Sequence, residues 1–312
     1  MKGKDLLSVS DLSSEDINLL MSDTMVMKAS GWLSSLSSKS LALLFEKPSL
    51  RTRTSFEVAI RQLGGQAIYL SPNEVGLGKR ESAADIARVL NRYVDAIVAR
   101  TFSHSTLEEI ACHTDIPVIN ALSDKEHPCQ ALADLFTIYE KKGDLKGLTL
   151  AYIGDGNNVA QSLLLAAALT GLNFRIASPK DYTIDKKMLS IAKGYVIDSG
   201  ATIFVTEKPT QAVINADIVY TDVWTSMGQE AESQKRRQVF TEYQINGKLI
   251  ALAKEDAILM HPLPAHHGEE VAEGVLDSPA SVVFDQAENR MHLTKSLLIS
   301  IMGGLEVPLP GY

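Results

Sequence analysis

The sequence has very few cysteines and no apolar run of membrane-spanning length. Cys112 and Cys129 are its only cysteines, and their spacing fits neither a disulfide framework nor a metal site. The longest apolar stretch, residues 163–172, is too short to cross a bilayer. Residues 1–5 lack the apolar core of a signal peptide. We therefore expect a cytoplasmic protein with no membrane partner.

An excess of positive charge is also missing. The 38 acidic side chains outnumber the 30 basic ones, which gives a net charge of −8. A general nucleic-acid-binding protein needs a basic surface, so we expect no nucleic-acid partner. Repeats, low-complexity tracts and Gly/Ser linkers are absent as well. A chain of 312 residues with this composition is long enough for two domains with separate cores.

One junction in the first half combines features of an anion site. An apolar run predicts a buried strand that ends at Phe45, and helical spacing begins near Thr52. Ser49, Arg51, Thr52 and Arg53 therefore lie at a helix N-terminus, where free N–H groups and the helix dipole favour an anion. Two arginines and two hydroxyls add hydrogen-bond donors suited to phosphate. The alternative is an ordinary Ser/Thr cap, but cations in a first helical turn oppose the dipole.

Short apolar runs alternate with helical patterns along the chain. The strands expected in the first half are 41–45, 66–70, 95–99 and 117–121, and the helices are 52–63, 82–93, 105–113 and 131–141. The strands expected in the second half are 148–153, 173–178, 201–205, 217–220 and 257–260, with a helix at 159–170. This alternation predicts an α/β protein with two doubly wound parallel sheets, in which ligands bind outside the carboxyl ends of the strands.

Polar side chains follow two of the first-half strands. Arg100 ends one strand, although a guanidinium in that place, taken on its own, is more simply explained as a surface charge. His127 and Gln130 precede a helix, where a neutral imidazole can donate to a carbonyl oxygen and an amide can pair with another amide. Cys129 has no base partner in the sequence, so we interpret it as a packing residue and not as a nucleophile.

The second half contains a glycine-rich turn, Gly154–Asn158, that is similar to the start of a dinucleotide-binding unit. The fingerprint requires a third glycine where Val159 stands and an acidic residue where Ser178 stands. Both are missing, which argues against nicotinamide binding. We expect no cofactor.

Two later strand ends also carry polar clusters. The segment 222–230 brings a carboxylate, a hydroxyl and a glycine together, a combination that could bind an amine ligand. The alternative is a loop that is simply exposed to solvent. The segment 261–268 has paired prolines, which hold the backbone carbonyls in a fixed arrangement. Fixed carbonyls can accept hydrogen bonds from the NH2 group of an amide ligand. Its three histidines do not have the spacing of a helical ligand pair, and no cysteine or acidic partner is expected nearby, so we expect no metal.

In this order the motifs resemble the aspartate and ornithine carbamoyltransferase family. Ser49–Arg53 matches the Ser-x-Arg-Thr-Arg motif of that family, and 127–130 matches its His-Pro-x-Gln motif. Within the family, 222–228 and 284–292 are similar to the ornithine branch, and Asn158 matches its amino-acid-binding asparagine. The resemblance runs through nearly the whole chain.

The resemblance implies two α/β domains of similar size linked by helices. A carbamoyl phosphate-binding domain would span 1–141 and an ornithine-binding domain 142–290, with a C-terminal helix at 291–312 that rejoins the first. It also implies a homotrimer, or a multiple of trimers, in which the loop 73–80 reaches a neighbour's site. The implied reaction transfers the carbamoyl group of carbamoyl phosphate to the side-chain amine of ornithine. Citrulline and phosphate are the products, in arginine biosynthesis, and no metal or cofactor takes part.

Carried over residue by residue, the resemblance assigns three sets of ligands. The phosphate ligands are Ser49, Leu50, Arg51 and Thr52. The ligands of the carbamoyl group are Arg100, His127, Gln130, Pro262, Leu263 and Arg290. The ornithine ligands are Asn158, Asp222, Ser226 and Met227. Of these residues, the catalytic ones are expected to be Arg51, Arg100, His127 and Pro262.

Two positions depart from the family pattern. Pro262 stands where the ornithine branch usually has cysteine, and Gly76 stands where many members have glutamine. Two alternatives therefore stay open. The acceptor is a different amine, such as putrescine or another amino acid, or the chain is a catalytically silent carbamoyl phosphate-binding paralogue. Asp222 and residues 226–228 favour ornithine, because they would contact the second substrate directly.

Overall fold

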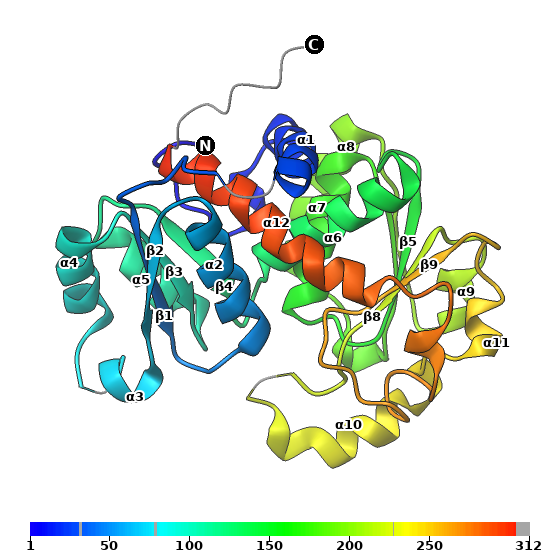
Figure 1. Ribbon diagram of the computed structural model, residues 1–312. Coiled ribbons are helices and arrows are strands. Elements are labelled where there is room, and N and C mark those ends of the chain that lie inside the picture. Colours follow the sequence, from blue (N-terminus) through cyan, green and yellow to red (C-terminus); the bar gives the residue numbers. More distant parts are fainter. Residues whose placement is uncertain (31–32, 78–79, 227, 304–312) are drawn as a thin grey trace, which may run out of the picture. The chain divides into compact units, whose positions relative to one another are not determined.

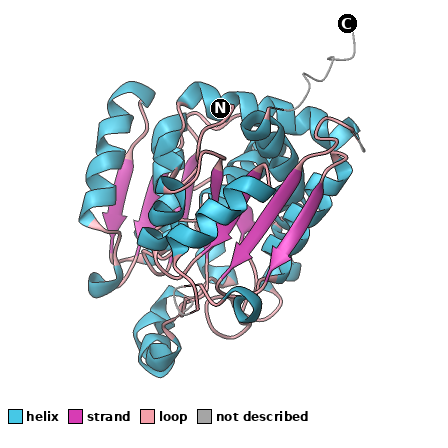
Figure 2. Cartoon of the chain, turned by 90° about the vertical axis from the view of Figure 1, so that its left-hand side faces the viewer, coloured by secondary structure: helices cyan, strands magenta, loops and turns pink. Residues whose placement is uncertain are grey.

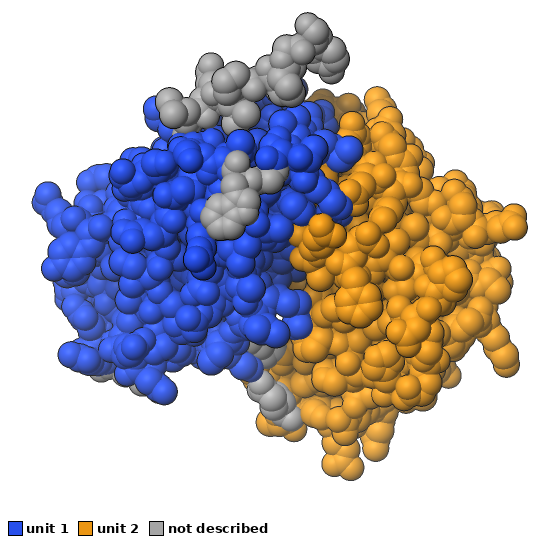
Figure 3. Space-filling model, viewed as in Figure 1, with its two compact units in different colours: residues 1–132, 289–312 blue, residues 133–288 orange. Residues whose placement is uncertain are grey.

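A computed structural model describes residues 1–30, 33–77, 80–226 and 228–303. Its contacts divide the chain into two compact units (Figure 3). Unit 1 comprises residues 1–132 and 289–312, and unit 2 comprises residues 133–288.

The two divisions fall within helices α6 (Pro128–Lys142) and α12 (Val283–Met302). The domain limits expected at 141/142 and 290/291 remain predictions. Residues 304–312 of the expected C-terminal helix lie outside the described residues.

Unit 1 is built on a four-stranded parallel sheet of order β2-β1-β3-β4. Its strands are labelled in Figure 1, and Figure 2 shows the strands of the chain in magenta among the helices in cyan. Its strands are β1 (Ser40–Phe45), β2 (Gln66–Leu70), β3 (Ala96–Arg100) and β4 (Val118–Leu122). Its helices are the short 3-10 helix η1 (Val9–Asp11), α1 (Ser14–Ser30), α2 (Leu50–Gln62), α3 (Pro72–Val75), α4 (Ala83–Tyr93), α5 (His104–Cys112) and the parts of α6 and α12 named above.

Side chains of β1 alternate between the two faces of this sheet. Ala42 and Leu44 share a buried cluster with Ile86 and Leu90 of α4 and with residues of α5. The intervening residues Leu41 and Leu43 are equally buried. Since both faces are covered, the strand reads as one continuous apolar run.

Unit 2 contains a five-stranded parallel sheet of order β7-β6-β5-β8-β9. Its strands are β5 (Thr149–Ile153), β6 (Asn173–Ala177), β7 (Ile203–Thr206), β8 (Ile218–Thr221) and β9 (Ile258–Met260). Its α-helices, besides parts of α6 and α12, are α7 (Asn158–Thr170), α8 (Lys186–Ser199), α9 (Pro209–Val213), α10 (Ser233–Phe240) and α11 (Gly247–Ile250). Its short 3-10 helices are η2 (Lys180–Tyr182), η3 (Glu230–Glu232), η4 (Thr241–Tyr243) and η5 (Val275–Asp277).

Aromatic residues fill one layer of the core of unit 2. The ring of Tyr152 on β5 stacks on Phe174 of β6 and Tyr220 of β8, with centroids 6.5 and 5.6 Å apart. Their neighbours on the strands, such as Ile153 and Val219, belong to a second cluster that includes Phe240. Both faces of this sheet are therefore buried as well.

Each sheet has a point where the connections leave in opposite directions. In unit 1 this point lies between β1 and β3, whose last residues, Phe45 and Arg100, are paired. In unit 2 it lies between β5 and β8, where the last residues, Ile153 and Thr221, are paired. Ligands of open α/β sheets bind in the crevice at such switch points. The predicted fold class, two parallel-sheet α/β domains, is confirmed.

None of the helices in the described part of the chain combines the length and the apolar character needed to span a bilayer.

Candidate functional site

A polar cluster forms at the switch point of unit 1. Ser49 caps α2, because its Oγ accepts from the N–H of Thr52 at 3.4 Å and donates to the Thr52 hydroxyl at 3.0 Å. The side chain of Leu50, the first residue of the helix, is 78% exposed. Any contribution of Leu50 to a polar site must therefore come from its backbone.

The buried hydroxyl of Thr52 joins three distant segments. It accepts from Nη1 of Arg100 on β3 at 3.3 Å and from Nη2 of Arg290 on α12 at 2.8 Å. Arg290 also donates to Oε1 of Gln130 at 2.9 Å. All four residues are at least nine-tenths buried. The structure thus brings together five of the residues expected from the sequence, Ser49, Thr52, Arg100, Gln130 and Arg290.

Positive charge is concentrated in this cluster. Burial, followed by repulsion from Arg290 and Arg51, lowers the pKa of Arg100 to about 10. Burial, followed by repulsion from Arg290 and Arg100, lowers the pKa of His127 well below 6.5, so its imidazole is neutral at neutral pH. Guanidinium groups held close together in a buried place are relieved by a bound anion.

Arg53 does not join the cluster. Its Nε donates to Glu57 at 2.8 Å, and its Cζ lies 3.8 Å from the centre of the Tyr69 ring. The expectation that both arginines of this turn face one anion therefore needs correction. Residues two apart on a helix point about 200° apart around its axis, so Arg51 and Arg53 face different directions.

Cys129 behaves as a packing residue. It is buried, its Sγ donates to the carbonyl of Asn120 at 3.4 Å, and burial raises the pKa of its thiol to about 12. A thiol that stays protonated at neutral pH is a poor nucleophile.

In unit 2 a second cluster forms at the end of β5 and β8. Asn157 is the N-cap of α7, and its Oδ1 accepts from the N–H groups of Val159 and Ala160. Its Nδ2 donates to Oδ2 of Asp222 at 2.8 Å and to Oγ of Ser226 at 3.3 Å. The structure therefore brings Asp222 and Ser226 together, with Asn157 as the residue that joins them.

Asp222 is buried, and the pKa of its carboxyl is raised above the ordinary value. Burial raises the pKa of its carboxyl, while His261, Asn157 and the N–H of Val223 lower it. Asn158 is the first residue of α7, and its Oδ1 accepts from the N–H of Val159 at 3.0 Å. Met227 lies outside the described residues, so its expected contact with ornithine remains a prediction.

Arg236 of α10 joins the two segments that carry this second cluster. Its Nη1 donates to Oδ2 of Asp155 at 2.7 Å and to the carbonyl of Trp224 at 2.9 Å. Both partners lie in segments that carry candidate ligands, the turn before α7 and the segment after β8. The sequence reasoning missed Asn157 and Arg236. Asparagine is a preferred N-cap residue, and this preference could have identified Asn157. Arg236 is a basic residue on a polar helix, which gives no comparable signal.

Pro262 and Leu263 follow β9 in unit 2. The N–H of Leu263 donates to Nδ1 of the buried His261 at 2.9 Å, and Nε2 of His261 lies 3.3 Å from Oε1 of Glu270. The backbone of Leu263 is left-handed, with φ at 55°. The other residues expected to bind carbamoyl phosphate belong to unit 1, and the expected contacts of Pro262 and Leu263 remain predictions.

Two acidic residues lie close to one of these histidines, so the expectation that none is nearby is wrong. Ligand atoms of His266, Glu269 and Glu270 lie within 4.8 Å of one another. Glu269 also pairs with Arg237 at 2.8 Å, and Glu270 accepts from the backbone of His266 at 2.5 Å. Both carboxylates are thus held by partners of their own chain.

The backbone conformation at residue 76 explains why glycine stands there in place of the glutamine found in many family members. Gly76 ends α3 with φ at 62°, a left-handed conformation that glutamine rarely adopts. An added Cβ would also lie 2.9 Å from the Cβ of Arg80. Residues 78–79 of the expected loop lie outside the described residues.

Two parts of the chain match two domains of one family. Residues 4–140 match the aspartate/ornithine carbamoyltransferase carbamoyl-P binding domain. Residues 146–301 match the aspartate/ornithine carbamoyltransferase Asp/Orn binding domain.

Similar proteins cover nearly the full chain. An ornithine carbamoyltransferase of Anoxybacillus flavithermus is 52% identical over 306 residues, 97% of this chain and 98% of that protein. An anabolic ornithine carbamoyltransferase of Pyrococcus furiosus is 47% identical over 310 residues, 98% of each chain. A solved structure of an ornithine carbamoyltransferase from Pyrococcus furiosus, 48% identical, has a TM-score of 0.94 and covers 98% of this chain and 99% of its own. The chain belongs to the aspartate/ornithine carbamoyltransferase family.

Proposed function

We propose that the chain is a carbamoyltransferase that converts carbamoyl phosphate and L-ornithine to L-citrulline and phosphate. The observation that carries this proposal is the buried cluster around Thr52, in which Arg100 and Arg290 share one hydroxyl. Family membership supports the same conclusion, and so do relatives that are described as ornithine carbamoyltransferases.

Carbamoyl phosphate binds at the N-terminus of α2. Ser49, the backbone of Leu50, Arg51 and Thr52 hold the phosphate group, whose negative charge suits both the helix dipole and the guanidinium. Arg100, His127, Gln130 and Arg290 hold the carbamoyl group. Gln130 already accepts from Arg290, which leaves its NH2 group oriented by a buried charged partner.

Ornithine binds in unit 2 through both of its α-substituents. Asp222 accepts from the α-ammonium group, and Asn158, Ser226 and Met227 complete the site. The contact of Asn157 with Asp222 at 2.8 Å supports this role, because a buried carboxylate must be held in one orientation to recognise an ammonium group.

The chemistry is a direct displacement. The side-chain amine must lose its proton before it attacks, and an alkyl ammonium titrates near ~10.4. Binding both substrates aligns the amine with the carbamoyl carbon, a positioning effect. Arg100 and the neutral His127 stabilise the developing oxyanion, and Arg51 with the α2 N-terminus stabilises the phosphate as it leaves. The carbonyls of Pro262 and Leu263 accept from the carbamoyl NH2 group.

Pro262 is the residue that supports the two alternatives, a different amine acceptor or a catalytically silent paralogue. The usual thiol is missing from this position, and a chain that uses another amine or no amine at all would tolerate that loss. Asp222 favours ornithine over putrescine. Putrescine has no α-amino acid group for Asp222 to bind, because its two ends are identical amines and it has no α-carboxylate.

Further properties complete the proposal. The protein forms homotrimers or multiples of trimers in the cytoplasm, and exposed apolar side chains of unit 1, such as Tyr93 at 74%, support an assembly. It acts in arginine biosynthesis, as supported by the Pyrococcus furiosus relative that is described as anabolic. Size-exclusion chromatography with light scattering measures the assembly directly.

An acceptor comparison tests the function. Carbamoyl phosphate is supplied with ornithine, putrescine or aspartate, and both phosphate release and carbamoylated product are measured. We expect product with ornithine alone. Product with putrescine or aspartate instead would assign a different acceptor, and binding of carbamoyl phosphate without any product would assign a silent paralogue.

A further inference from the structure

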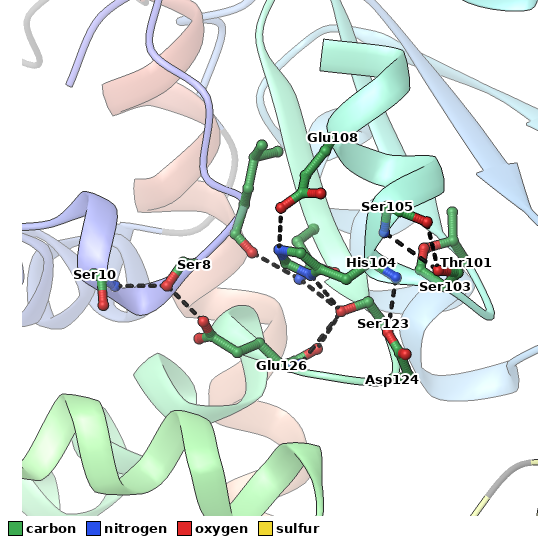
Figure 4. A network of polar contacts seen from close by, with 12 residues as sticks. Ser8, Ser10, Thr101, Ser103, His104, Ser105, Glu108, Ser123, Asp124 and Glu126 are labelled. Atoms are coloured by element: carbon green, nitrogen blue, oxygen red, sulfur yellow. Dashed lines mark hydrogen bonds and ion pairs between the residues drawn. The ribbon is translucent and has the colours of Figure 1, made fainter. Parts of the chain in front are cut away.

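A buried histidine outside the proposed site lies beside the loop that leads to His127. His104 is the first residue of α5 and is 7% exposed. Its Nδ1 lies 2.8 Å from Oγ of Ser123, which follows β4 and is fully buried (Figure 4). Glu108, one turn further along α5, lies 3.9 Å from the other ring nitrogen.

His104 and Ser123 fix the loop of residues 123–126. The N–H of Ser123 donates to the carbonyl of Glu126 at 2.9 Å, and the N–H of Glu126 donates back to Oγ of Ser123 at 3.3 Å. The backbone N–H of His104 donates to Oδ1 of Asp124 at 2.7 Å. The N-terminus of α5 thus holds two adjacent residues of the loop.

The N-terminal segment holds the loop from the other side. Ser8 Oγ donates to Oε1 of Glu126 at 2.5 Å (Figure 4), and the N–H of Val9 donates to Oε2 at 3.0 Å. The same segment pairs with β4 through a bridge between Leu6 and Ile119. The carboxylate of Glu126 is 3% exposed, and these donors offset the cost of its burial.

A Ser–His–Glu set also occurs in hydrolytic enzymes, where the serine is a nucleophile. Ser123 does not fit that role. Its exposed surface is 0%, and its Oγ accepts from the backbone of Glu126 inside the loop. The contact between His104 and Ser123 therefore serves the shape of the loop.

We infer that His104 is a positioning residue that holds loop 123–126 so that His127 presents its ring to the carbamoyl group. This inference rests on the proposed function. His127 follows Glu126 directly, and a catalytic side chain displaced by about 1 Å loses on the order of 100-fold in rate. Hydrogen bonds from the two flanking segments restrict three of the four loop residues, Ser123, Asp124 and Glu126.

Substitution of His104 separates this role from a general structural one. His104→Leu removes the ring nitrogen, and His104→Asn places a polar atom near the position of Nδ1. We expect kcat for citrulline formation to fall roughly 10- to 100-fold in His104→Leu and to recover largely in His104→Asn. Binding of inorganic phosphate, measured by calorimetry, should stay unchanged, because phosphate is held at Ser49–Thr52. His113→Asn, at the other end of α5, is the matched control and should keep the wild-type kcat.

A double-mutant cycle with His127→Gln decides whether His104 acts through His127. In the His127→Gln background we expect His104→Leu to change kcat by less than about twofold. The same loss in both backgrounds would overturn the inference, and so would a parallel loss of phosphate binding. Wild-type activity of His127→Gln alone would instead refute the role of His127 in the proposed function. If His104→Leu fails to fold, Ser123→Ala carries the same expectations for kcat, because it deletes the oxygen that contacts both the His104 ring and the N–H of Glu126 in the same loop.

Discussion

Arg290 donates to the hydroxyl of Thr52 at 2.8 Å, across 238 residues of sequence. Thr52 also accepts from Arg100 at 3.3 Å, so one buried hydroxyl holds two guanidinium groups near each other. Their mutual repulsion contributes to the lowered pKa of Arg100. A dianionic ligand at this point would be attracted by both groups at once.

Thr52→Val tests this contact with little change in side-chain volume. Removing the hydroxyl deprives both arginines of an acceptor, a loss of about 1–3 kcal/mol. We expect the affinity for carbamoyl phosphate to fall roughly tenfold or more, as measured by calorimetry. Thr54→Val, at an exposed position on the same helix, is the control. Equal affinities of the two variants would refute the role of Thr52.

Arg51 and Arg53 form a matched pair on α2. Arg51→Ala should lower carbamoyl phosphate affinity by about 100-fold, because charged hydrogen bonds contribute about 1.5–3 kcal/mol each. Arg53→Ala should leave the affinity unchanged, since Arg53 pairs with Glu57 and lies over Tyr69. Similar losses in both variants would show that the turn binds phosphate by general charge alone.

Asp222 and Asn157 should affect the second substrate alone. Asp222→Asn removes the charge that we propose binds the α-ammonium group, and we expect the KM for ornithine to rise about 100-fold. Asn157→Ala should raise the same KM, with unchanged affinity for carbamoyl phosphate. Asn246→Ala is the control, because Asn246 also caps a helix of unit 2, so both variants lose a cap worth about 1 kcal/mol. A similar KM for ornithine in both asparagine variants would contradict the role of Asn157.

The neutral state of His127 predicts a pH dependence of stability. Its pKa in the folded protein lies well below 6.5, so below pH 6.5 the unfolded chain binds a proton that the folded protein does not. The contribution of neutral His127 to the free energy of unfolding is therefore present above pH 6.5. It is lost as the pH falls, by up to about 1.4 kcal/mol per pH unit. His127→Gln should flatten the fall in the free energy of unfolding below pH 6.5, measured with urea. An unchanged slope would contradict the lowered pKa.

Activity should rise toward alkaline pH. The attacking amine is almost fully protonated at neutral pH, because its pKa is near ~10.4. Initial rates at subsaturating ornithine should increase with pH until the amine is deprotonated. A flat profile between neutral and alkaline pH would show that amine deprotonation does not control the rate.

Local signals predicted the strands well, since both faces of each sheet are buried. The apolar runs that end at Phe45 and Ile153 are strands, and the polar residues after them lie at the carboxyl ends, as expected. Helix α6 begins at Pro128, three residues before the predicted start, because proline is favoured at the first helical position.

Long-range and rotational relations were harder to predict. The contact of Arg290 with Thr52 has no local signal, and only the family resemblance suggested Arg290. The sequence does not show which of Asn157 and Asn158 faces Asp222, since consecutive residues at a helix start point about 100° apart. The contacts of Arg53 with Glu57 and Tyr69 were not predicted either, because the sequence does not show which way a side chain points around a helix.

A crystal structure with carbamoyl phosphate bound tests the central claim most directly. We predict electron density for its phosphate at the N-terminus of α2, in contact with Ser49, Arg51 and Thr52, and for its carbamoyl oxygen beside Arg100. Density at another place, away from Arg51 and Arg100, would contradict the account.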